Sequence, residues 1–206
     1  MIANILTPIS KNRNDPQELN HLFSNLNFKN INLIGEGPGP KLDYFIFEEQ
    51  PNHAENCVAI RINRLQSARG ANNEMRLTAL KNKRCAHPFF CFSLSWPQSE
   101  RPGIGPVMQS VEHTLRQLHM QDCQYILTVH QHPFYTYCKI VLNRIHPINY
   151  QAKSLKGAQE KLHLAARQCE IIHHWTHENG IFIAVPGDFN FTRIIHNPQF
   201  KNFRIT

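Results

Sequence analysis

Two strand-like segments near the middle of the chain constrain the fold more than any other feature of the sequence. Residues 125–129 and 138–145 are rich in β-branched and other apolar side chains, and a short loop around Pro133 joins them. β-Branched and aromatic residues favour strands, and a short connection favours a hairpin-like antiparallel pair. The chain is therefore expected to contain an antiparallel sheet.

Apolar periodicity elsewhere predicts helices interleaved with further strands. The first helix is expected to begin after Asp15, a favourable N-cap, with Pro16 at its first position. A buried strand is expected to end at Pro97, because proline cannot donate to a strand ladder. Helices are predicted at 15–26, 69–82, 107–118 and 156–175, and further strands at 44–47, 58–62, 89–96 and 181–185. This order predicts the α+β class, with helices packed on a largely antiparallel sheet.

The length of 206 residues suits a single domain, which is predicted to cover 1–206. A Gly/Pro loop is expected at 35–40, and residues from about 187 to 206 are a candidate tail. No apolar run is long enough to cross a bilayer and the first ten residues carry no secretory signal, so a cytoplasmic protein is expected. Six cysteines without a CxxC pair indicate reduced thiols.

The basic charge of the chain allows two interpretations. A net charge of +7 and a pI near 9.2 indicate a surface that attracts phosphate groups. The same modest excess also serves solubility. The Gly/Pro loop at 35–40 does not strengthen the first interpretation, because its prolines remove backbone donors and no lysine–serine pair follows.

Several longer motifs carry a family resemblance. The segment HPFFCFSLSWPQSERP places Ser95 at the end of a strand, followed by Trp96 and Glu100. The segment YILTVHQHPFYTYCKIVLNRIHP places His130 at the end of one strand and continues a second strand into LNRIHP. With ARQCEIIHHWTHENGIFI downstream and the start MIA, these segments resemble plasmid relaxases of the MOB-P type, a family of conjugative mobilisation nucleases.

The resemblance implies the HUH endonuclease fold, a five-stranded antiparallel sheet with packed helices. It also implies site- and strand-specific nicking of DNA at a plasmid transfer origin. In that family a tyrosine near the N-terminus attacks the scissile phosphate. Three histidines hold a divalent metal that polarises the phosphate oxygens.

The sequence departs from this family at both catalytic elements, which makes it a degenerate member. The family tyrosine falls near Phe23, which has no hydroxyl, and no tyrosine occurs before Tyr44, the alternative position for a displaced nucleophile. The first metal histidine matches His130, but the other two positions hold Tyr137 and Lys139.

The remaining histidines make a weak metal site. One family histidine of three does not hold magnesium or manganese tightly. His130 and His132 share one face of a strand and are weak metal candidates. We therefore expect no cofactor, with a divalent metal as the less favoured alternative.

Other residues are candidates for binding rather than catalysis. Lys139 would place a positive charge roughly where the family has its metal, and such a charge attracts phosphate without catalysis. Ser95 either hydrogen-bonds a phosphate or caps its strand, and Tyr135 and Tyr137 either stack on bases or pack on the sheet. Scattered surface charges usually only solvate a fold. The predicted DNA contacts are Arg61, Arg64, Arg69, Arg76, Lys139, Asn143 and Arg144.

These observations favour a relaxase-like protein of plasmid conjugation or mobilisation that binds single-stranded or transfer-origin DNA without nicking it. The first alternative is a protein-interaction module that contacts other relaxosome proteins, a type IV coupling protein or the type IV secretion apparatus. The second is a DNA-nicking enzyme with a site rebuilt around His130 and His132. No membrane partner is expected. Salt-dependent affinity for single-stranded DNA distinguishes the favoured hypothesis from the first alternative.

Overall fold

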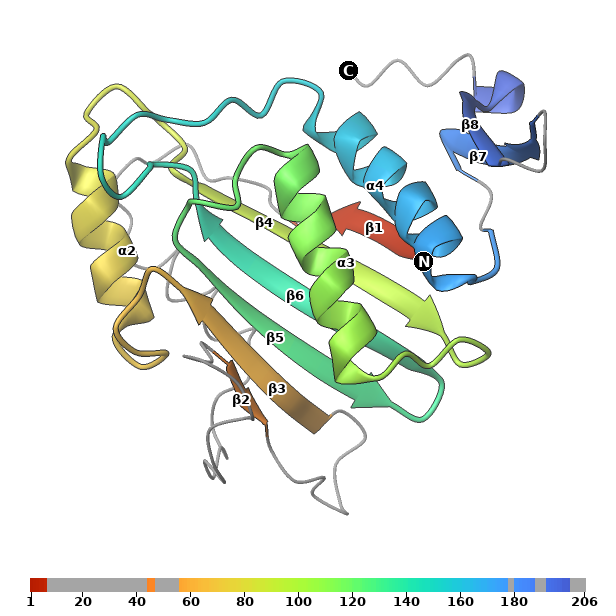
Figure 1. Cartoon of the computed structure of the whole chain (residues 1–206). Helices are drawn as coiled ribbons and strands as arrows, with labels where there is room; N and C mark the ends of the chain where they lie inside the picture. Colours follow the sequence, from red (N-terminus) through yellow and green to blue (C-terminus); the bar gives the residue numbers. More distant parts are fainter. Residues whose placement is uncertain (7–43, 47–55, 178–179, 188–191, 201–206) are drawn as a thin grey trace.

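The computed structural model describes residues 1–6, 44–46, 56–177, 180–187 and 192–200 (Figure 1). The helix predicted at 15–26 and the Gly/Pro loop predicted at 35–40 lie outside these residues. The described helices are α2 (Ala71–Leu80), α3 (Ile104–Gln117), α4 (Ala158–His173) and the short 3-10 helix Pro198–Phe200. None of them combines the length and apolarity needed to cross a bilayer.

The main sheet has the strand order β1-β4-β6-β5-β3-β2, and every neighbouring pair is antiparallel. The three-residue β2 extends the β3 edge of the five-stranded sheet that the resemblance implied. The strands are β1 (Ile2–Ile5), β2 (Tyr44–Ile46), β3 (Asn56–Asn63), β4 (Phe89–Pro97), β5 (Tyr125–His132) and β6 (Tyr135–Asn143). This arrangement confirms the α+β class and the antiparallel sheet.

The hairpin predicted around Pro133 is the β5–β6 pair, and its strands are longer than the sequence suggested. Their ladder continues to the pair His132–Tyr135, so only Pro133 and Phe134 form the turn. The prediction ended β5 at residue 129 and began β6 at residue 138 because polar residues replace the apolar run there. Backbone pairing continues through those polar residues and projects them from the sheet in register.

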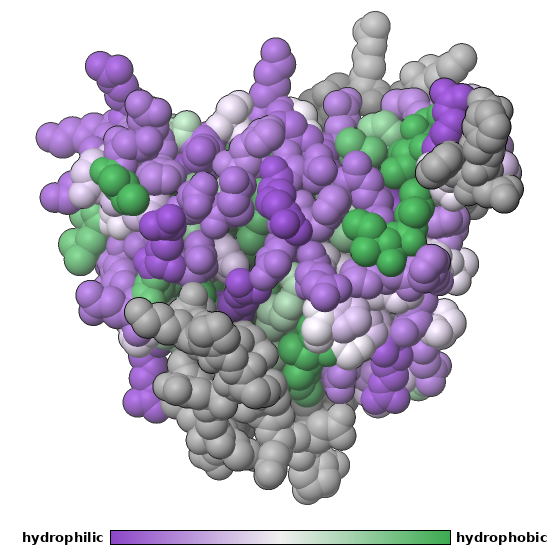
Figure 2. Space-filling view, viewed as in Figure 1, coloured by the Kyte–Doolittle hydropathy of each residue, from purple (hydrophilic) through white to green (hydrophobic). Residues whose placement is uncertain are grey.

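Helices α3 and α4 cover one face of the sheet, which we call the helix face (Figure 1). Val107, Val111 and Leu115 form an apolar stripe along α3, at the helical spacing that the sequence indicated. They join Phe92 and Leu94 of β4 in one buried cluster. Burial of each such side chain contributes about 1.5–3 kcal/mol. Seen from this side, the surface is mostly hydrophilic (Figure 2).

Helix α2 packs on the opposite face, which we call the α2 face. Its buried residues Ala71 and Met75 join a second, smaller apolar cluster that includes Ile60, Ile126 and Val141 of the sheet. Alternate residues along a strand point to opposite faces. The β4 serines and the aromatic residues of β6 therefore project on the same side as α2.

A buried charge cluster fixes β1 against α4. Glu170 of α4 is fully buried; its carboxylate accepts a hydrogen bond from the α-amino group of Met1 at 2.8 Å and forms an ion pair with Arg167 at 2.6 Å. Arg167 also donates to the Met1 carbonyl oxygen at 2.9 Å, and Nδ1 of His177 lies 3.1 Å from Glu170. Buried charges require such partners. The cluster positions the edge strand that borders the candidate site.

Strands β7 (Phe182–Pro186) and β8 (Thr192–His196) form a separate antiparallel pair that contacts α4. β7 confirms the strand predicted at 181–185. β8 lies in the segment from 187 onward that the sequence suggested as a tail. Asn197 connects the two ends of the pair, because its backbone N–H donates to the Ile181 carbonyl at 2.7 Å and its side chain donates to Gly180 at 3.0 Å.

All six cysteines are free, as the sequence suggested. Cys138 is completely buried in β6, and this burial raises the pKa of its thiol to about 12. A thiol with so high a pKa is a poor nucleophile at neutral pH. We therefore assign Cys138 to packing rather than to chemistry.

Candidate nucleic-acid interface

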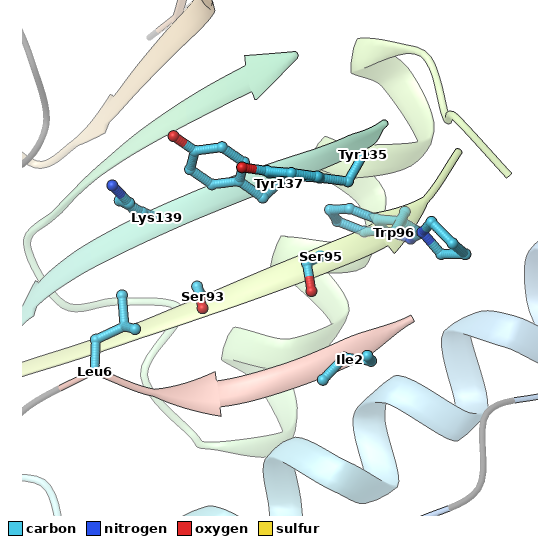
Figure 3. Close-up of a pocket in the computed structure, with 9 residues that line it drawn as sticks. Ile2, Leu6, Ser93, Ser95, Trp96, Tyr135, Tyr137 and Lys139 are labelled. Carbon is cyan, nitrogen blue, oxygen red and sulfur yellow. The ribbon is translucent and has the colours of Figure 1, made fainter. Parts of the chain in front are cut away.

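A shallow depression of about 440 Å³ lies on the α2 face, across strands β1, β4 and β6 (Figure 3). β1 and the residue after it contribute two apolar side chains, β4 contributes two serines, and β6 contributes two tyrosines and a lysine. The lining residues are Ile2, Leu6, Ser93, Ser95, Trp96, Pro97, Tyr135, Tyr137 and Lys139. The depression thus combines an apolar wall, hydroxyl groups, aromatic rings and a cation.

The strand register brings the polar lining residues together in cross-strand pairs. Ser93 lies directly opposite Lys139, and Ser95 lies directly opposite Tyr137. Side chains of such pairs project on the same face with Cβ atoms about 4.5–5.5 Å apart. Figure 3 shows both serines between the β1 residues and the β6 residues. The predicted site residues Ser95 and Lys139 therefore share one site.

Aromatic and histidine rings of the β5–β6 hairpin form a connected group, which we call the ring stack, made of two stacked pairs joined by a tilted pair of tyrosines. His130 lies against Tyr137 with ring centroids 4.7 Å apart and planes 5° apart, and His132 lies against Tyr135 at 4.4 Å and 22°. Tyr135 and Tyr137 are themselves 5.7 Å apart. Phe134 in the turn is 67% exposed, and the centroid of its ring lies 5.5 Å from that of His132. Flat rings of this kind are the groups on which nucleic acid bases stack.

Lys139 places its cation at one end of this stack. Its Nζ lies 5.1 Å from the centroid of the Tyr137 ring, within the range of a cation–π interaction. The same charge acts on the neighbouring thiol of Cys91. Burial raises the pKa of Cys91 to about 12, and the positive charge of Lys139 opposes that rise. Lys139 therefore supplies a positive potential on the α2 face.

His130, which the resemblance matches to the first family metal ligand, lies in an environment that is aromatic rather than ligating. It is 2% exposed, its Nε2 lies 2.9 Å from the Thr128 hydroxyl, and its ring stacks on Tyr137. Among the described residues, no group of three His, Cys, Asp or Glu side chains could hold a metal ion. The weak candidates His130 and His132 each face a different tyrosine.

The arginines predicted from β3 lie away from the depression. Arg61 points to the helix face, where its guanidinium donates to Glu112 of α3 at 2.6 Å. Arg64 follows the end of β3 and lies 3.5 Å from Asp122, and both side chains are exposed. These two residues therefore do not extend the depression.

Arg69 and Arg76 are better placed for a ligand on the α2 face. Both are exposed, Arg69 just before α2 and Arg76 within it. The helix that carries Arg76 packs on the same face of the sheet as the depression.

Asn143 and Arg144, also predicted as DNA contacts, have structural roles. Asn143 is 0% exposed, and its side chain donates to the Met75 carbonyl at 3.0 Å and to Gln124 at 3.1 Å. The guanidinium of Arg144 donates to the carbonyls of His87 at 2.7 Å and Lys153 at 2.8 Å. A side chain as buried as Asn143 is not accessible to DNA. The donors of Arg144 bind backbone carbonyls of two other segments of the chain.

Sequence reasoning missed Ser93 and the apolar wall formed by Ile2 and Leu6. Ser93 precedes Ser95 by two residues in the run FSLSW, so the alternation of a strand already placed both on one face. The β1 residues could not be assigned because nothing in the sequence pairs β1 with β4. The positions considered for a nucleophile at 21–23 lie outside the described residues, as does the side chain of Tyr44.

Comparison with known proteins returns one finding. A family model described as "Relaxase: MobA/VirD2-like, nuclease domain" matches residues 45–175. The match spans well over half of the 206 residues and includes strands β4 and β6 of the depression. A search of curated proteins and a search of solved structures each return no match.

Proposed function

The chain belongs to the relaxase family with a MobA/VirD2-like nuclease domain, and from this premise we propose that it binds single-stranded DNA of a transfer origin without nicking it. This activity would serve conjugative transfer or mobilisation of a plasmid, in which the protein would act as a component of the relaxosome.

The observation that carries the proposal is the ring stack beside a cation on one face of the sheet. His132 and Tyr135 present half-exposed rings, which are backed by the buried rings of His130 and Tyr137, and Lys139 lies beside Tyr137. Proteins that bind single strands combine aromatic side chains, which stack on bases, with a basic surface that follows the backbone. The net charge of +7 supplies long-range attraction to the phosphates.

The chemistry of the metal positions supports binding without cleavage. The second and third family ligands correspond to Tyr137 and Lys139. Protonated lysine has three donors and no lone pair for a cation. Phe23, near the position of the family nucleophile, has no hydroxyl that could attack phosphorus. These substitutions remove both the Lewis acid and the nucleophile of the family reaction.

An anisotropy titration of a labelled single-stranded oligonucleotide at two salt concentrations, with and without manganese, tests the proposal. The endpoints are run on a denaturing gel. We expect salt-sensitive, manganese-independent binding and intact DNA. Absence of binding at low salt would overturn the proposal and favour the protein-interaction module. Cleavage or a covalent adduct would favour an enzyme with a rebuilt site.

A matched pair of variants connects that binding to the ring stack. Tyr135→Leu removes one stacked ring, and we expect affinity to fall by about tenfold, since stacking contributes roughly 1–3 kcal/mol per base. Tyr150→Leu removes an exposed tyrosine from the loop after β6 and should leave affinity unchanged. Equal effects of the two changes would mean that the stack is not the binding surface.

A further inference from the structure

The side chains that line the depression change from apolar to polar to basic from one strand to the next, and this order determines what the depression can bind. Ile2 and Leu6 form an apolar edge on the β1 side, Ser93 and Ser95 provide hydroxyls in the middle, and Lys139 and the two tyrosines form the far edge (Figure 3). None of the lining residues in the described part of the chain is acidic. An anion would therefore meet donors and a cation without meeting a carboxylate.

The pair Ser93–Lys139 offers donors to one tetrahedral anion from two neighbouring strands. The two residues are directly opposite each other on β4 and β6, so their side chains rise side by side from the sheet. The ammonium offers three donors and the hydroxyl offers one. Two oxygens of a single phosphate could accept from both groups, with the charge-assisted bond to lysine as the stronger of the two.

A neighbouring flat surface indicates that the anion is part of a nucleotide. Tyr135 lines the same depression two positions from Tyr137, and its ring is half-buried. The volume of about 440 Å³ lies within the range of roughly 300–1,000 Å³ that small-ligand sites occupy. A phosphate at Ser93 and Lys139 would leave space for an attached sugar and base between the tyrosines and the β1 wall.

We propose that this depression is a metal-independent subsite for one phosphodiester group, held by the Lys139 ammonium and the Ser93 hydroxyl, with the attached base against Tyr135. This inference rests on the proposed binding of single-stranded DNA and states how the same site recognises it. In this arrangement the fixed charge of lysine neutralises the phosphate that a metal ion would otherwise meet.

The thymidine dinucleotide with one internal phosphodiester and no terminal phosphate is the sharpest probe, because it carries a single charge. Its affinity for the full chain is compared by competition with that of the uncharged methylphosphonate analogue, with EDTA present throughout. We expect the charged dinucleotide to bind about tenfold more tightly, because the uncharged analogue loses the charge-assisted contact to Lys139.

Variants then assign that preference to residues. Lys139→Met should bind both dinucleotides equally, whereas Lys156→Met, which removes an exposed lysine just before α4, should keep the preference. Ser93→Ala should reduce the preference by a few-fold. Unchanged thermal unfolding of each variant shows that the effect belongs to the site. A preference retained in Lys139→Met would overturn the inference, as would binding that EDTA abolishes.

A longer labelled oligothymidylate separates this inference from the proposed function. If the longer strand does not bind, the proposed function itself fails. If the strand binds but the charged and uncharged dinucleotides compete equally, only the subsite fails. Competition by inorganic phosphate as strong as that of the dinucleotide would mean a free-phosphate site, and this outcome would also overturn recognition of a nucleotide.

Discussion

The two faces of the main sheet are built from alternate residues of the same strands, yet they differ in the part of the sheet that α2 does not cover. On β4, Phe92 and Leu94 are fully buried against the helix face, while Ser93 and Ser95 between and beside them line the depression. The helix face is apolar and holds the core. Where α2 does not cover it, the α2 face carries the hydroxyls, rings and cation that line the depression.

This difference explains how a relaxase domain can keep its fold when residues of its α2 face change. Tyr137 and Lys139 project from the α2 face, whereas their neighbours Cys138 and Ile140 are 0% exposed in the core on the other side. Replacing a side chain that projects from the α2 face leaves the packing of the helix face intact. Retention of the fold in this family is therefore no measure of retained nicking activity.

The largest expected effect compares adjacent residues on opposite faces. Phe92→Ala should lower the free energy of unfolding by about 3–5 kcal/mol, because it removes a fully buried ring from the helix-face core. Ser93→Ala should change the free energy of unfolding by less than about 0.5 kcal/mol, because Ser93 is half-exposed. Denaturant unfolding measures both.

DNA titration of the same two variants completes the comparison. The folded fraction of Phe92→Ala should bind single-stranded DNA as the parent does, whereas Ser93→Ala should bind more weakly. A reversed pattern, with stability lost at Ser93 and affinity lost at Phe92, would show that the two faces are not separated in function.

A smaller effect is expected at Asn143, which the sequence placed among the DNA contacts and the structure buries beneath α2. Asn143→Ala removes the buried donor to the Met75 carbonyl and to Gln124, so stability should fall by about 1–3 kcal/mol. Thermal or chemical unfolding measures the loss. The affinity of the folded variant for DNA should not change. Weaker DNA binding without a loss of stability would show that Asn143 is a DNA contact.

The sequence was informative where a local pattern decides the structure. Strand alternation and the short loop at Pro133 were sufficient to predict the β5–β6 hairpin, and helical spacing predicted the buried stripe of α3. Long-range partners were not predictable in this way. Arg144 resembles a free basic residue in the sequence, and only the tertiary fold brings the His87 and Lys153 carbonyls to its guanidinium.

The face on which a strand residue projects was the second unpredictable feature. Alternation separates Arg61 from Ile60 and Ile62, but the sequence does not say which set meets α3 and which meets α2. Pairing register decides this, and a shift of one residue exchanges the faces. The β3–β5 ladder contains such an irregularity between Cys57 and Ala59. Arg61 therefore pairs with Glu112 on the helix face.

Two arginines on opposite sides of the sheet give the next test. Arg76→Ala, on α2, should lower affinity for single-stranded DNA by a few-fold and reduce the slope of log affinity against log salt by about 0.7, the value for one phosphate contact. Arg61→Ala should leave the slope unchanged and cost about 0–1 kcal/mol of stability through its pair with Glu112. Equal slopes for both variants would remove Arg76 from the interface.

The smallest expected effect concerns acid sensitivity of the helix layer. Burial lowers the pKa of His163 on α4 from its ordinary value of 6.5, and the charge of Arg167 lowers it further. The unfolded chain therefore binds a proton at His163 at a higher pH than the folded chain does. Stability should fall as pH drops below about 6.5, until the folded histidine is also protonated.

His163→Gln provides the measurement, because it removes this titration and leaves the other histidines in place. The pH range from about 7.5 to about 5 brackets the ordinary histidine pKa of roughly 6.5. Over this range the unfolding free energy of the parent should fall more than that of the variant. Parallel curves would place the acid sensitivity elsewhere. Since His163 lies on α4 and not on the α2 face, DNA affinity of the folded protein should respond to pH equally in both proteins. A pH response of DNA binding that disappears in His163→Gln would show that the helix layer and the depression are coupled.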